Sequence, residues 1–139
     1  MFEFHGWATI RDTADCDDLQ SEPKAQTVER IRQLIAGLRD HSRHTDLQWV
    51  NGALHLSLGG LHNHRRDQIA AFFTNVAAAA PGSYGVLYVR DDEDPTEPNT
   101  WRRLAMRRGE LHDEPDTSLS PHVDLVEDEC VHDGAMDCA

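Results

Sequence analysis

The sequence predicts an α+β fold, a two-layer sandwich in which two helices cover one face of an antiparallel sheet of about five strands. Three observations predict it. Apolar and polar residues alternate in several short segments, two other segments repeat apolar residues at helical spacing, and Asn51-Gly52 joins two of the alternating segments. The 139 residues fit one domain of this kind and suffice for a core without disulfide support.

The first strand and the first helix lie near the N-terminus. Between residues 2 and 10 every second residue is apolar or small, which is typical of a half-buried strand and places Trp7 on its less apolar face. After a loop up to Gln20, Ser21 and Pro23 suit the start of a helix. The apolar stripe of this helix consists of Val28, Ile31, Leu34, Ile35 and Leu38.

A hairpin is the clearest local signal in the sequence. Asn51-Gly52 favours a two-residue type I′ turn, because asparagine and glycine tolerate the positive φ angles that this turn requires. The turn sets a register of four pairs, Val50 with Ala53, Trp49 with Leu54, Gln48 with His55 and Leu47 with Leu56. Apolar residues then share one face of the hairpin, so the turn and the pattern agree.

A second helix and the last strands complete the predicted order. Asn63 suits the N-cap of the helix and Pro81-Gly82 its end, and between them runs a stripe of Ile69, Phe72, Phe73, Val76 and Ala80. Strands are predicted at residues 84–89 and 101–108, and Leu111 allows one further short strand. The order strand-helix-strand-strand-helix-strand, plus an extra strand, matches a ferredoxin-like sandwich.

The sheet face away from the helices is predicted to be polar but to expose aromatic side chains. It would carry His5, Trp7, Gln48, His55, Trp101, Arg103 and Arg107. Residues beyond about 115 lack periodicity and basic residues. The expected organisation is therefore one α+β domain at residues 1–115 and an acidic C-terminal arm at residues 116–139, with a frayed end.

The protein is acidic, and the charge is concentrated in two places. Acidic residues outnumber lysine and arginine by 25 to 13, which gives a formal net charge of −12. Residues 113–139 contain no lysine or arginine and carry −9 of this charge, and residues 91–98 form a second concentration, the acidic loop. This charge disfavours nucleic acid and anionic membranes as partners and favours a basic protein.

The cysteines and the N-terminus predict a soluble cytoplasmic protein. Cys16, Cys130 and Cys138 are an odd number without repeated spacing, which is not the pattern of a disulfide framework. The N-terminus lacks the basic and apolar regions of a signal peptide, and no segment approaches the roughly 18 apolar residues that span a bilayer.

No motif for catalysis, a metal or a cofactor is found. GxSxG, GxGxxG, GxxxxGK[ST], HExxH and paired CxxC patterns are all missing. The best metal candidates are His62 with His64, and the set of Cys130, His132 and Cys138, but loop histidines of this kind more often serve turns and caps. The sequence therefore predicts a protein that is not an enzyme and has no cofactor, with a metal-dependent enzyme kept as one alternative.

A single-stranded RNA-binding sheet is the other alternative. Such modules stack bases on exposed aromatic side chains of an open sheet, and Trp7, Trp101 and nearby arginines fit that pattern. The acidic loop and arm would repel phosphate, and no RNP-like aromatic string is present.

The acidic loop itself has three interpretations. It is a solvated turn, a calcium site or a docking surface for a cationic partner. Its order of residues lacks the Asp-x-Asp-x-Asp-Gly layout of an EF-hand, which argues against calcium. A docking surface would raise the association rate with a basic partner and help to select it.

Five segments carry a resemblance to known proteins, namely residues 4–11, 49–52, 61–65, 80–94 and 119–121. Together they resemble the immunity protein 7 family of bacterial polymorphic toxin systems. The resemblance spreads from Phe4 to about Glu129, and the run from Pro81 to Asp94 is its most specific part. Where relatives are expected to have Cys-x-Pro, this chain has His122-Val123-Asp124.

The resemblance implies a protein without catalytic activity that binds a cognate toxin domain and occludes its active surface. A nuclease toxin would suit the charge best, because a nuclease presents basic groups to phosphate. The hypothesis is that Asp91, Asp92, Glu93 and Asp94, helped by Glu127, Asp128 and Glu129, meet a basic toxin surface, while His62, Asn63, His64 and Arg65 shape the adjacent edge. The sequence leaves open whether the loop or the arm is the main contact, and what the oligomeric state is.

Overall fold

The computed structural model describes residues 1–14 and 22–123. They form two helices and six strands: β1 (Phe2–Ile10), α1 (Ala25–Leu38), β2 (Asp46–Val50), β3 (Ala53–His62), α2 (Asp67–Ala79), β4 (Tyr84–Asp91), β5 (Arg102–Arg107) and β6 (Glu110–Pro115). Among these elements no helix is long and apolar enough to cross a membrane.

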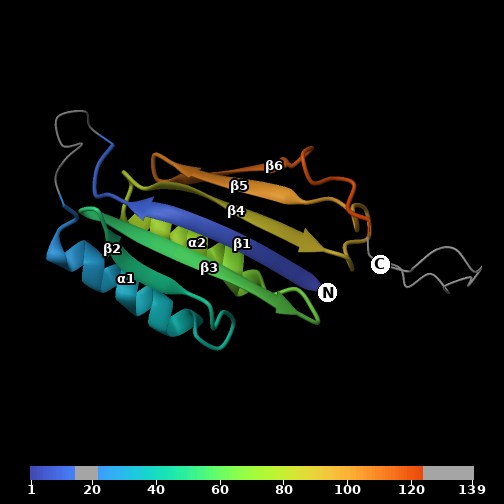
Figure 1. The fold of residues 1–139 in the computed structure, drawn as a ribbon, viewed down its shortest axis with the longest axis horizontal. Coiled ribbons are helices and arrows are strands. Elements are labelled where there is room, and N and C mark those ends of the chain that lie inside the picture. The colour runs from blue at the N-terminus through green and yellow to red at the C-terminus, as the bar shows by residue number, and fades with distance from the viewer. Residues whose placement is uncertain (15–21, 124–139) are drawn as a thin grey trace, which may run out of the picture.

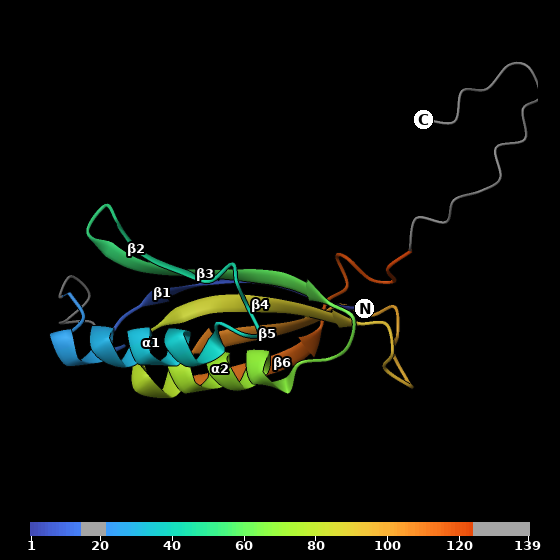
Figure 2. The ribbon, with the colours of Figure 1, turned by 90° about the horizontal axis from the view of Figure 1, so that it is seen from below.

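The six strands form one antiparallel sheet in the order β2-β3-β1-β4-β5-β6 (Figure 1). Figure 2 shows both helices on the same side of this sheet. The α+β class, the two helices on one face and the antiparallel sheet are thus as predicted, but the sheet has six strands where about five were expected.

The sequence indicated the sixth strand only weakly, because the turn that leads into it contains an arginine where such turns usually have asparagine or glycine. β5 and β6 are joined by Arg108-Gly109, whose φ angles of 50° and 79° equal those of Asn51-Gly52 between β2 and β3. Both turns therefore have the positive φ angles of a type I′ hairpin. Arginine seldom signals such a turn, so only the first hairpin could be recognised in the sequence.

The register of the first hairpin is confirmed in full. Val50 pairs with Ala53, Trp49 with Leu54, Gln48 with His55 and Leu47 with Leu56. β3 then continues to His62 and pairs with β1, which is one of the two central strands of the sheet.

The core lies between the sheet and the helices. β1 contributes Phe2, Phe4, Ala8 and Ile10, which alternate as the sequence predicts. Burial of such side chains is the main stabilising contribution to a domain of this size. The rest of the buried cluster includes Ile31, Leu38, Leu54, Leu56, Leu58, Ile69, Phe72, Phe73, Val76, Leu87, Leu104 and Met106.

The helix starts differ from the prediction. Asn63 is not an N-cap, because α2 begins at Asp67 and its N-cap position, Arg66, forms no side-chain capping bond. At α1 the side chain of Asp12 takes the capping role from outside the helix: its Oδ2 accepts a hydrogen bond from the Lys24 N–H at 2.6 Å, and its Oδ1 accepts one from the Thr27 hydroxyl.

The turn from α2 into β4 holds β4 close to β1. The Ser83 hydroxyl accepts a hydrogen bond from the Arg11 N–H at 3.0 Å and donates one to the Arg11 carbonyl at 3.4 Å. Two residues later Gly85 lies so close to β1 that an added Cβ would be 2.1 Å from the Trp7 carbonyl oxygen. The Pro81–Gly85 part of the run that resembles the family most closely therefore serves the packing of β4 on β1.

Trp101 is buried, whereas an exposed aromatic was expected on the open face. The chain turns back after β6, and the Trp101 N–H donates to Ser120 Oγ at 2.9 Å while the indole N–H donates to His122 Nδ1 at 3.3 Å. On the sheet side the guanidinium of Arg90 lies 6.0 Å from the centre of the Trp101 ring. Residues 116–123, assigned to the arm from the sequence, thus contact the body at this point.

Candidate functional site

Two loops meet at one end of the sheet. β1 runs between β3 and β4, and Phe2 pairs with both His62 and Asp91, so the end of β3 and the end of β4 lie on either side of the same residue. The loops that follow them come into contact, because His64 Nδ1 lies 2.9 Å from Glu93 Oε1. We call the acidic loop together with residues 63–66 the two-loop surface.

The acidic loop has a defined shape because two of its carboxylates build turns. Asp91 Oδ1 accepts the Glu93 N–H at 3.0 Å. Asp94 Oδ1 accepts the N–H groups of Thr96 and Glu97 at 2.9 and 3.0 Å and the Thr96 hydroxyl at 3.0 Å. These bonds, with that from the Thr96 N–H as the largest cause, hold the pKa of Asp94 below its ordinary value.

The lowered pKa of Asp94 predicts how the loop responds to acid. Protonation removes the negative charge that accepts these bonds, so the stabilisation is present above the ordinary aspartate pKa and is lost as the pH falls through the lowered one. In an NMR titration, the Asp94 carboxyl and the amides of Thr96 and Glu97 should titrate together, below the pH of an ordinary aspartate. The Asp94→Asn variant should lack this transition, and a midpoint at or above the ordinary value would contradict the expectation.

Several charges of the loop are compensated within the chain. The Met1 amino group donates to Asp92 and thereby holds the pKa of Asp92 below its ordinary value. Glu97 pairs with Arg102 at 3.0 Å, and Arg102 also pairs with Asp113 at 2.7 Å. The hydrogen bond with Asp113 is the largest cause that raises the pKa of Arg102. Glu93 keeps 54% of its side chain exposed while it contacts His64 of the neighbouring loop.

The remaining predicted site residues have different positions. His62 is half-buried, stacks 5.9 Å from the Phe4 ring and lies within hydrogen-bonding distance of the His41 carbonyl, so it is a packing residue. Asn63 is exposed, and Arg65 donates to Asp67 at 2.8 Å. Glu127, Asp128 and Glu129 lie outside the described residues.

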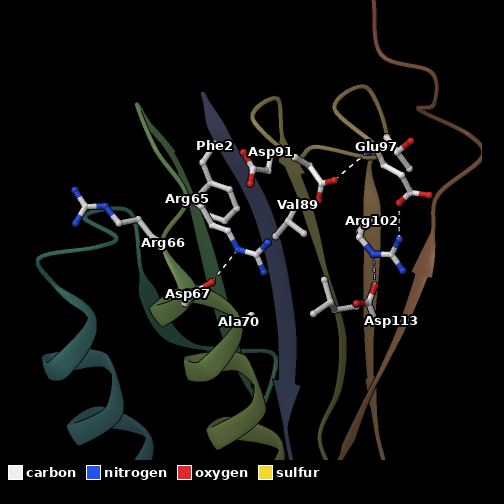
Figure 3. Close-up of a pocket in the computed structure, with 13 residues that line it drawn as sticks. Phe2, Arg65, Arg66, Asp67, Ala70, Val89, Asp91, Glu97, Arg102 and Asp113 are labelled. Carbon is white, nitrogen blue, oxygen red and sulfur yellow. Dashed lines mark hydrogen bonds and ion pairs between the residues drawn. The ribbon is translucent and has the colours of Figure 1, made fainter.

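A pocket beside the acidic loop is a feature that the sequence did not reveal. It lies between the start of α2 and strands β4 to β6, with a volume of about 130 Å³ (Figure 3). Its residues come from four separate stretches of the chain, at residue 2, residues 65–70, residues 89–104 and residue 113, so no local pattern identifies it. They are Phe2, Arg65, Arg66, Asp67, Ala70, Val89, Asp91, Asp94, Glu97, Thr100, Arg102, Leu104 and Asp113.

The metal candidates of the sequence do not converge in the described part of the chain. His62 and His64 have separate partners, the His41 carbonyl and Glu93. Across residues 1–14 and 22–123 no group of three or more His, Cys, Asp and Glu side chains could hold a metal ion. Cys130, His132 and Cys138 lie outside these ranges.

The open face of the sheet exposes aromatic side chains far from the two-loop surface. Trp7 and Tyr84 are each 46% exposed and meet edge to face, with ring centres 6.2 Å apart. Arg103 on the same face pairs with Glu114 at 2.9 Å, so its charge is compensated.

No curated protein and no solved structure matches the chain. The model of one family, described as Immunity protein 7, matches residues 1–128, which include all six strands, both helices and the two-loop surface. Such a match over nearly the whole chain shows the resemblance seen in the sequence to be a family relationship, and the chain belongs to the immunity protein 7 family.

Proposed function

We propose that this protein is the immunity partner of a polymorphic toxin, and that it binds the toxin domain in the cytoplasm through the two-loop surface and blocks its active surface without catalysing a reaction. Membership of the family supports the class of function, which is toxin immunity. The charge of the chain supports a basic target, and a nuclease domain is the toxin class that must expose basic groups to phosphate.

The contact between His64 and Glu93 is the observation that carries this proposal. It joins the two loops into one surface at the end of the sheet, and the turns at Asp91 and Asp94 fix the shape of its acidic half. A surface with fixed shape loses little conformational freedom on binding, which favours affinity. Its negative charge accelerates encounter with a basic toxin and selects against other partners.

A variant that removes charge without removing hydrogen-bond acceptors tests the proposal. Asp91→Asn, Asp92→Asn, Glu93→Gln and Asp94→Asn together keep the side-chain oxygens that build the turns. The association rate with the cognate toxin domain should fall by roughly ten- to a hundredfold at low salt and should become less dependent on salt, as expected when steering charges are lost. Stopped-flow or biosensor kinetics measure both.

The matched control removes the same charge elsewhere. Glu29→Gln, Asp40→Asn, Asp46→Asn and Glu110→Gln change four exposed carboxylates that form no ion pair among the described residues. This variant should keep most of the association rate. Equal losses in the two variants would show that total charge is responsible, and no loss in the first would exclude the two-loop surface.

The exposed pair of Trp7 and Tyr84 favours one other function, single-stranded RNA binding on the open face. A gel shift with mixed RNA at physiological salt separates the two. The immunity proposal expects no shifted band, whereas a band that Trp7→Ala abolishes would support RNA binding.

A further inference from the structure

The pocket beside the acidic loop combines an apolar lining with an acidic one. Phe2, Ala70, Val89 and Leu104 supply the apolar part, and Figure 3 shows carboxylates of α2, the acidic loop and β6 around it. Five carboxylates and three arginines line the pocket, so its charged groups carry a net negative charge. A site of this composition suits a long side chain that ends in a cation.

Most of these charged groups already have partners. Arg65 pairs with Asp67 at 2.8 Å, and Arg102 pairs with Glu97 and Asp113 at 3.0 and 2.7 Å. Arg66 points away from the pocket in Figure 3, toward His41 Nδ1 at 3.5 Å. Arg65 and Arg102 are thus held in ion pairs, and Arg66 is directed elsewhere. The charge of Arg65 also acts on Asp94, although the two side chains form no ion pair.

Asp91 and Asp94 are the two lining carboxylates that form no ion pair within the described residues. Each uses Oδ1 to accept hydrogen bonds within the acidic loop, and the structure gives Oδ2 of neither residue a hydrogen bond from residues 1–14 or 22–123. Both carboxylates are half-buried beside the apolar lining. Each can thus accept a cationic donor without loss of the turn that it builds.

We propose that this pocket receives an arginine side chain of the toxin, with its aliphatic part against Phe2, Val89 and Leu104 and its guanidinium at Asp91 and Asp94. This inference rests on the proposed function, because it names the group by which the toxin is held. Arginine fits better than lysine, since a guanidinium is weakly hydrated and offers five donors to two carboxylates, and charge-assisted bonds of this type are strong.

A small probe tests the pocket without the toxin. N-acetyl-arginine methylamide, titrated into the whole protein, should shift the methyl NMR signals of Ala70, Val89 and Leu104. The citrulline analogue has the same shape without the charge and should leave them unchanged. Equal shifts with citrulline, equal shifts with the lysine analogue, or no shift with arginine would each overturn the assignment.

Two matched pairs of variants test the pocket in the complex. Ala70→Leu should fill the pocket and weaken toxin binding by roughly tenfold or more, as loss of a central anchor does. Ala78→Leu is the control, because it places the same side chain at an exposed position farther along α2.

A second pair of variants tests the charges of the pocket. Asp91→Asn with Asp94→Asn removes two lining charges, whereas Asp92→Asn with Glu93→Gln removes two charges of the same loop that do not line the pocket. The lining pair should mainly accelerate dissociation, and the other pair should mainly slow association.

The outcomes separate this inference from the proposed function. If the unaltered protein does not bind the toxin domain, the proposed function fails. If it binds, and Ala70→Leu with an unchanged unfolding midpoint binds equally well, the proposed function stands and the arginine pocket is wrong. Equal kinetics for the two charge pairs would also contradict the pocket.

Discussion

Phe4→Ala is expected to destabilise the protein by about 3–5 kcal/mol, the range for removal of a large aromatic side chain from a core. Phe4 is fully buried in β1, with its ring 5.8 Å from that of Phe2 and 5.9 Å from that of His62. Loss of the ring would leave a cavity between β1 and the helices. Because most domains are stable by only about 5–15 kcal/mol, the change should be visible directly in a urea or guanidinium unfolding curve.

The effect of Phe4→Ala should also reach the two-loop surface. His62 stacks on this ring and leads into the loop that contains His64. Hydrogen exchange at residues 63–66 should therefore rise more than exchange in α1. Leu61→Ala is the control, because Leu61 is a strand neighbour with an exposed side chain and its removal should cost no more than about 0.5 kcal/mol. Similar losses in both variants would contradict the assignment of Phe4 as a core anchor.

Gly85→Ala is expected to destabilise the protein by about 3 kcal/mol or more, the upper range for an insertion into a packed core. The added Cβ would meet the Trp7 carbonyl oxygen at 2.1 Å and the Ala8 Cα at 2.6 Å. Both are backbone atoms that cannot rotate away, so β4 and β1 would have to separate at this point. Chemical denaturation measures the loss of stability.

Gly37→Ala is the matched control for Gly85→Ala. Gly37 lies in α1, and a Cβ there would meet nothing within 4 Å. The same substitution should therefore stabilise the protein by roughly 0.5–1 kcal/mol, because alanine restricts the unfolded chain and favours a helix. A loss at position 37 as large as that at position 85 would show that the close approach of β4 to β1 is not the cause.

The fold was predictable where local chemistry and periodicity agreed. Asn51-Gly52 and the alternation around it determined a register that the structure reproduces pair by pair. The turn at Arg108-Gly109 was not predictable in the same way, because arginine rarely adopts the positive φ angle that Arg108 has at the first turn position. The capping of α1 by Asp12 joins residues 12 positions apart, beyond the span of a local capping pattern.

The candidate site was predictable in its parts and not in its arrangement. Charge alone indicated the acidic loop, and the structure adds that His64 contacts Glu93 across 29 positions of sequence. The pocket is lined by Phe2, Ala70 and Asp113, which are far apart in the sequence, and the strand order brings them together. A strand was predicted from Trp101, which directly precedes β5, and the burial of Trp101 depends on the return of the chain at Ser120 and His122.

The hydrogen bonds between Ser83 and Arg11 hold β4 beside β1, at the end of the sheet away from the two-loop surface. This position matters when members of the family that bind different toxins are compared. The Pro81–Gly85 segment, a part of the run that resembles the family most closely, joins α2 to β4 and packs against β1. A related chain could keep this joint unchanged while it exchanges every side chain at the far end of the sheet. The run of closest resemblance continues from this joint to Asp94 in the two-loop surface, so only its second half bears on the choice of toxin. A shared joint alone would not predict that two relatives protect against the same toxin.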